Sequence, residues 1–189
     1  MILLFNMGLP MIVPAMYFMV LALVPIVLLE SFYISRSLGV RFPRTVGPVA
    51  LGNIVSTLVG IPVTWFLLFA VQMIVGSASS YNADGFLERV LSVTLYAPWL
   101  APSPEEMYWI FPLAALFLLI PFFFATWFVE YVVGRNNLAG AIVEVRDSIE
   151  TRDAERLVWR ATRNSNLLSY GIIALFIVVS LIAGAIIAR

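Results

Sequence analysis

Four long runs of apolar residues dominate the sequence. Each has the roughly 20 mostly apolar residues that an α-helix needs to cross the hydrocarbon core of a bilayer. The predicted spans run from Gly8 to Leu29, Pro48 to Val75, Tyr108 to Val133 and Leu167 to Ala188. Because a helix satisfies its own backbone hydrogen bonds in lipid, the pattern predicts an all-α integral membrane protein. We expect a single domain over residues 1–189, with the four helices packed as a bundle.

Arginine is concentrated in two of the connections between these spans. Three arginines lie between the first and second spans, and six lie between the third and fourth. The positive-inside rule therefore places residues 31–47 and 134–166 in the cytoplasm, and residues 77–107 and both termini outside it. The N-terminal residues have no basic region and no cleavage site, so we expect the first run to remain as a helix. The predicted location is a cell membrane, either inner or plasma.

Two connections contain shorter periodic segments. In the outer connection, apolar residues recur at helical spacing from Phe86 to Leu95, which predicts a short amphipathic helix in the membrane interface. The alternative is a cap over an outward cavity. In the other connection, an apolar stripe from Leu138 to Ile149 breaks near Thr151 and resumes at Leu157, which predicts two short amphipathic helices. Their charged face is interpreted as solvated, or alternatively as a docking surface for a partner.

Small side chains follow one face of the second span at every fourth position. Such stripes allow a neighbouring helix to approach closely. We interpret them as intramolecular packing faces, with homodimerisation as the alternative. The predicted packing residues are Gly52, Ser56, Gly60 and Thr64 in the second span, and Ser180 and Gly184 in the fourth.

A polar pattern occurs twice, once in each half of the chain. A glutamate lies at or near the end of the first and third spans, and an Asn-x-x-Ser sequence lies at or near the start of the second and fourth spans. This repetition predicts two pseudo-repeated hairpins related by an axis along the membrane normal. The residues of the pattern are Glu30, Asn53, Ser56, Glu130, Asn166 and Ser169.

The glutamates of this pattern require partners at their predicted depth. An ionised carboxylate costs roughly 2.5 kcal/mol or more near the bilayer centre, so each glutamate should be paired, protonated or hydrated. Asparagine and serine three residues apart share a helix face and can supply hydrogen bonds to a neighbouring glutamate. The pattern favours an interhelical clamp, and its alternative is a site for a cation, a proton or a small polar ligand.

Composition excludes much familiar chemistry. The chain has no cysteine and no histidine, which removes thiolate nucleophiles, imidazole bases and most zinc sites. Its formal net charge is zero, so nothing favours nucleic-acid binding. We expect no cofactor, no metal and no enzymatic activity, with a carboxylate-dependent intramembrane hydrolase as the remaining catalytic alternative.

These observations favour a non-catalytic multi-pass protein, a scaffold or accessory subunit of a membrane complex. Its expected partners are the lipid bilayer and other membrane subunits or further copies of itself. The alternative is a small dimeric channel, carrier or ion-coupled protein that uses the glutamate and asparagine pattern as a polar site.

Overall fold

The computed structural model describes residues 12–75, 85–95, 104–145 and 149–187, and these residues are helical apart from short turns. Four of the helices are long and apolar enough to cross a membrane, as the sequence predicts. The fifth is short. The helices are α2 (Ile12–Leu38), α3 (Phe42–Val75), α4 (Phe86–Leu95), α5 (Pro104–Val145) and α6 (Thr151–Ile187).

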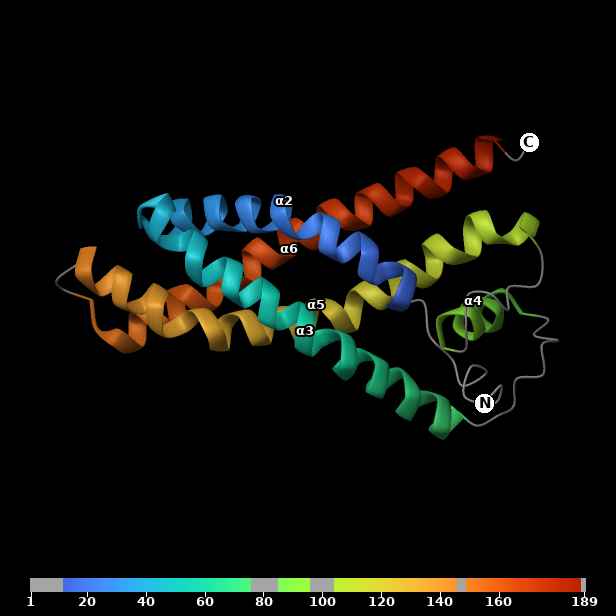
Figure 1. The fold of residues 1–189 in the computed structure, drawn as a ribbon, viewed down its shortest axis with the longest axis horizontal. Coiled ribbons are helices and arrows are strands. Elements are labelled where there is room, and N and C mark those ends of the chain that lie inside the picture. Colours follow the sequence, from blue (N-terminus) through green and yellow to red (C-terminus); the bar gives the residue numbers. More distant parts are fainter. Residues whose placement is uncertain (1–11, 76–84, 96–103, 146–148, 188–189) are drawn as a thin grey trace. The chain divides into compact units, whose positions relative to one another are not determined.

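The described chain divides into two compact units. One unit, Met19–Gly60 with Phe122–Ile172, contains the adjoining parts of α2, α3, α5 and α6. We call it the two-hairpin unit, because α2 with α3 and α5 with α6 form two antiparallel pairs within it (Figure 1). The other unit contains α4 together with the remaining parts of the long helices.

Local sequence explains where the first hairpin turns. The helix α2 ends at Leu38, and Gly39 follows with a positive φ of 70°. This left-handed conformation is common directly after a helix and costs a glycine least. The next helix begins at Phe42, and its first turn includes a bond from the Arg44 amide to the Arg41 carbonyl at 2.9 Å. The turn therefore takes only residues 39–41.

The long helices extend beyond the predicted spans, and this corrects one prediction. Residues 134–145 and 151–166 are not two separate short helices, because they continue α5 and α6. The physical reason is an aliphatic core at this end of the two-hairpin unit, which stabilises helix beyond the apolar runs. Of the predicted apolar stripe, Leu138 and Ile142 lie in this core and Ile149 and Leu157 pack against it, whereas Val145 is exposed. The buried members of the core are Val27, Ile34, Leu38, Val40, Val49, Leu138, Ala139, Ile142, Ala154, Val158 and Ala161.

The short helix in the outer connection is present as α4. Its Phe86 ring stacks on Trp109 of α5 with ring centroids 5.3 Å apart and an interplanar angle of 8°. This geometry is a favourable stacked arrangement of aromatic rings. The position of α4 at a membrane interface stays a prediction. Most of the outer connection, both termini, the start of the first predicted span and the end of the fourth lie outside the described residues.

Candidate functional site

The structure brings all six residues of the repeated polar pattern together inside the two-hairpin unit. The six residues lie on four helices, and each is buried. Glu30 is 1% exposed and Glu130 is 6% exposed. The residues are Glu30 on α2, Asn53 and Ser56 on α3, Glu130 on α5, and Asn166 and Ser169 on α6.

Glu30 is bonded by one residue from each hairpin. The Asn53 amide donates to its Oε2 atom at 2.8 Å, which joins α2 to α3 within the first hairpin. The Ser169 hydroxyl lies 2.6 Å from its Oε1 atom, which joins α2 to α6 of the second hairpin. One carboxyl group therefore links three helices.

Glu130 has the corresponding partners with the hairpins exchanged. The Asn166 amide donates to its Oε2 atom at 2.7 Å within the second hairpin. The Ser56 hydroxyl of the first hairpin lies 3.5 Å from its Oε1 atom, a longer and weaker contact. Each glutamate thus takes its asparagine from its own hairpin and its serine from the other. We call this arrangement of six residues the crossed cluster.

Helix geometry fixes the direction of these side chains. In both hairpins the asparagine amide also donates to the carbonyl four residues earlier, from Asn53 to Val49 at 3.2 Å and from Asn166 to Thr162 at 3.1 Å. Both serine hydroxyls lie near the carbonyl three residues earlier, at 3.0 and 3.1 Å. Such local bonds limit side-chain rotation, so the polar groups are held toward the neighbouring helices before they meet the glutamates.

Gly52 allows α3 and α5 to approach closely beside the crossed cluster. A Cβ atom at this position would lie 3.2 Å from Cγ and 3.3 Å from Cα of Glu130. No larger residue fits without displacing Glu130, so this glycine sets where the carboxyl group sits. Further along the same face, a Cβ atom at Gly60 would lie 4.0 Å from the Phe122 ring, which is ordinary contact.

The two small-residue stripes have different surroundings. In the second predicted span, the four members Gly52, Ser56, Gly60 and Thr64 are all buried. In the fourth, Ser180 is exposed and its hydroxyl donates to the Phe176 carbonyl of its own helix at 2.9 Å. Gly184 is half-buried. The first stripe is therefore used within the chain, whereas the second leaves an open face.

Sequence reasoning missed the aromatic residues beside the crossed cluster. The Tyr170 and Thr126 hydroxyls are 2.8 Å apart, and this bond joins α6 to α5. The Trp127 and Trp159 rings lie 4.4 Å apart, and Tyr131 meets Trp159 edge-on at 4.6 Å. The available signal was the position of Tyr170 directly after Ser169, opposite a threonine in the third span.

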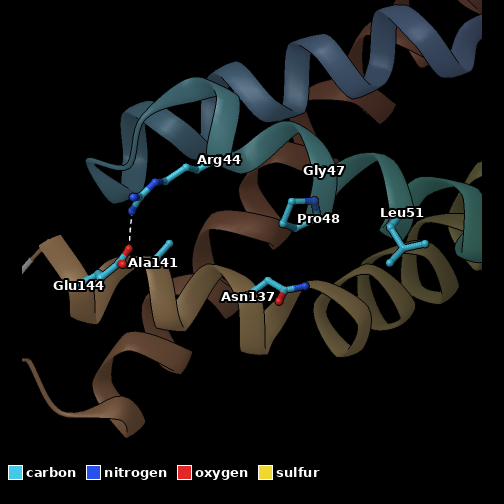
Figure 2. A pocket seen from close by; sticks show the side chains of 7 residues that line it. All are labelled: Arg44, Gly47, Pro48, Leu51, Asn137, Ala141 and Glu144. Carbon is cyan, nitrogen blue, oxygen red and sulfur yellow. Dashed lines mark hydrogen bonds and ion pairs between the residues drawn. The ribbon is translucent and has the colours of Figure 1, made fainter.

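A groove between α3 and α5 was also missed (Figure 2). Its volume is about 500 Å³, and an ion pair between Arg44 and Glu144 lies at one end. Both charged side chains are more than half exposed. Its other lining residues are Gly47, Pro48, Leu51, Asn137 and Ala141. The groove is lined by none of the six residues of the crossed cluster.

The chemistry open to the crossed cluster is hydrogen bonding and proton exchange. Among the described residues, no group of three or more acidic, histidine or cysteine side chains could hold a metal ion. A carboxyl group bonded by an amide and a hydroxyl can act as an acceptor, or as a donor when it carries a proton. The cluster therefore joins helices and offers two positions for protons.

Replacing Gly52 with alanine should destabilise the protein by about 1–3 kcal/mol, because the new methyl group would lie only 3.2–3.4 Å from Glu130 carbons, including its Cα, so a packed interface must move by a few tenths of an ångström. The measurement is the free energy of unfolding in mixed detergent micelles. Gly47→Ala on the same helix is the matched control, since nothing lies within 4 Å of the added atom. It should be neutral or stabilising by about 0.5–1 kcal/mol. Equal effects of the two changes would contradict the close approach.

Double-mutant cycles should detect the crossed pairing. We expect Glu30→Ala and Ser169→Ala to couple by about 0.5–2 kcal/mol in unfolding free energy, because their side chains meet at 2.6 Å. Glu30→Ala combined with Ser180→Ala should be additive, because Ser180 bonds only within its own helix. Additivity in the first cycle would rule out a bond between the hairpins at this position.

No protein-family model, no curated protein and no solved structure matches this chain. No activity, ligand or partner can therefore be transferred to it from a relative. The features that bear on function are the crossed cluster and the surfaces around it.

Proposed function

We propose that this chain is a non-catalytic multi-pass membrane protein that serves as a scaffold or accessory subunit of a membrane complex. The observation that carries the proposal is the crossed cluster, in which six buried polar residues bond to one another across two hairpins. Bonds of this kind between membrane helices contribute on the order of 0.6–2 kcal/mol each. They favour one fixed arrangement of the four helices, which is what a scaffold needs.

The same contacts support a pseudo-repeat of two hairpins. Exchanging the hairpins replaces each bond of the crossed cluster with its counterpart, including the asparagine bonds to the fourth preceding carbonyl. Such exchange is what a two-fold axis between the hairpins produces. We propose that this axis lies along the membrane normal, with both hairpin turns on the cytoplasmic side and both termini on the opposite side of an inner or plasma membrane.

An arginine face on α6 is the proposed docking surface. Arg152, Arg156, Arg160 and Arg163 are spaced by four, four and three residues, which places them along one side of the helix, and all four are exposed. Asp153 contacts Arg156 at 3.3 Å, and Glu155 lies half-buried three residues after Arg152, so four arginines outnumber two acidic residues here. Exposed arginines are suited to bidentate contacts with carboxylates of a partner subunit. We propose an acidic cytoplasmic segment of another membrane subunit as that partner.

Site-specific photocrosslinking tests the scaffold role. A benzophenone side chain at Arg160 should yield one adduct of constant mass from native membranes, and Arg156→Glu should abolish it by reversing the charge of the face. The control position is Leu175, which is exposed on an apolar part of α6 and should yield no protein adduct. A protein that is monomeric in mild detergent, with no adduct at Arg160, would contradict the proposal.

A small ion- or proton-coupled carrier is the second candidate. The observation that favours it is the burial of two carboxyl groups that form no ion pair with any described residue. Intramembrane carboxyl groups of this kind often mark ion or proton pathways.

Transport measurements in liposomes test this second candidate. The wild-type protein should dissipate an imposed proton gradient. Glu30→Gln should reduce the rate at least tenfold, because the glutamine amide cannot bind and release a proton as a carboxyl group does. Glu144→Gln is the control, since Glu144 is exposed and pairs with Arg44. A wild-type flux that survives both Glu30→Gln and Glu130→Gln would eliminate the carrier.

A further inference from the structure

The crossed cluster has fewer hydrogens than its acceptors require. A serine hydroxyl has one hydrogen to donate. The Ser169 hydroxyl lies 2.6 Å from Glu30 Oε1 and 3.1 Å from the main-chain carbonyl oxygen of Asn166. Both of these atoms are acceptors if Glu30 is ionised. The Ser56 hydroxyl has the same conflict between Glu130 Oε1 at 3.5 Å and the Asn53 carbonyl at 3.0 Å. One hydrogen cannot serve two acceptors fully.

Asn166 adds a further acceptor without a donor. Its amide uses both hydrogens, one toward Glu130 and one toward the Thr162 carbonyl. Its Oδ1 atom is buried and receives no hydrogen bond from the described residues. The whole residue is 0% exposed, so bulk water does not reach it. The shortage of hydrogens is therefore a property of the cluster and not of one serine.

Charge leads to the same conclusion. Two ionised carboxylates would place two negative charges in one buried cluster, and a buried charge without a partner costs several kcal/mol. The arginines in the adjoining turns of these helices, Arg36, Arg135 and Arg163, are exposed. The facing part of α3 contributes only neutral side chains, and α6 contributes Tyr170, whose hydroxyl is bonded to Thr126. No described group supplies the missing positive charge.

We propose that Glu30 and Glu130 are a pair of proton-binding sites, each holding a proton on Oε1 in the closed two-hairpin unit. Each carboxylic acid then donates to the serine of the opposite hairpin. That serine directs its own hydrogen to the main-chain carbonyl of the asparagine three residues earlier on its helix. The side-chain amide of each asparagine donates to Oε2 of the glutamate in the same hairpin. Both protons come from water and return to it. The inference is independent of whether the chain is a scaffold or a carrier.

Protons fit this cluster better than a metal cation does. The asparagine amides at 2.7 and 2.8 Å already point their hydrogens at carboxyl oxygens. A cation at those oxygens would meet the same hydrogens, and repulsion would break the contacts. A proton on each Oε1 atom instead resolves the conflict at both serines without moving any heavy atom, and among the described residues of the cluster Asn166 Oδ1 is the one buried acceptor that it leaves without a donor.

Loss of both protons should open the cluster. Two like charges would then face each other in a low dielectric, while the serines would return to serving two acceptors each. The hairpins are joined here by the Ser169 and Ser56 contacts, so these are the bonds that repulsion would weaken. The crossed cluster is thus a proton-dependent latch between the two hairpins.

Infrared spectroscopy of the intact protein in detergent counts these protons directly. A protonated carboxyl group has a C=O stretching band that a carboxylate lacks, and labelling with ¹³C-glutamate assigns it. We expect this band at neutral pH in the wild type, about half of it in Glu30→Gln or Glu130→Gln, and none in the double variant. Glu144→Gln should leave it unchanged, because Glu144 is exposed beside Arg44. Absence of the band in the folded wild type would overturn the proposal.

The pH dependence of unfolding gives a second count of the bound protons, for which the wild-type slope alone is sufficient. Above about pH 6 a free glutamate is ionised, so unfolding releases the two bound protons. Because the unfolded chain then binds fewer protons than the native one, stability falls as pH rises. The folding equilibrium constant should fall about 100-fold per pH unit in the wild type, about 10-fold in either single glutamine variant, and remain nearly flat in the double variant.

The alternative outcomes are distinct. A wild-type slope near tenfold would overturn the pair in favour of a single shared proton. A flat profile with carboxylate bands, together with stabilisation by sodium or potassium ions, would overturn it in favour of a cation site. If the glutamine variants do not fold, the wild-type band and slope still decide the question. None of these measurements depends on a partner subunit, so their failure is separable from failure of the scaffold proposal.

Discussion

The crossed bonding of two buried glutamates is the constraint on which the two-hairpin unit depends. Lipid offers a carboxyl group no hydrogen bonds, so Glu30 and Glu130 have to find hydrogen-bond partners inside the protein. Each finds an amide in its own hairpin and a hydroxyl in the other. A shift of either hairpin would leave polar atoms without partners in an apolar environment. The requirement for hydrogen-bond partners thus specifies how the hairpins meet.

Packing around the crossed cluster follows from this requirement. Side chains as short as asparagine and serine reach a glutamate on another helix only where the backbones are close. Gly52 provides that closeness between α3 and α5, since a Cβ atom there would meet both the side chain and the backbone of Glu130. Beyond the cluster, an aliphatic core closes the end of the unit that holds the turn at Gly39. Polar specificity and apolar packing therefore act on the same helix contacts.

A fixed hairpin arrangement and a proton-dependent one are compatible. With the glutamates neutral, the contacts of Ser169 and Ser56 hold the hairpins together and the asparagine bonds join the helices within each hairpin, which suits a scaffold. With both glutamates ionised, their two negative charges repel each other and weaken the contacts between the hairpins. The two readings of the polar pattern, clamp and site, thus describe two protonation states of one arrangement. Which protonation state is populated depends on access of protons to the cluster. The exposed arginine face of α6, which we propose as the docking surface, is separate from it.

The sequence by itself determined the long helices and the residues of the polar pattern, because apolar run length and helical spacing are local properties. It did not determine how far the helices continue, since residues 134–145 and 151–166 stay helical by packing on residues distant in the chain. Nor could it show that Ser169 bonds Glu30 rather than the glutamate of its own hairpin. Pairing between residues so far apart depends on which helix faces meet. Only the tertiary structure decides that, because the helix faces that meet must both allow the close backbone approach at Gly52 and give the buried glutamates their hydrogen-bond partners.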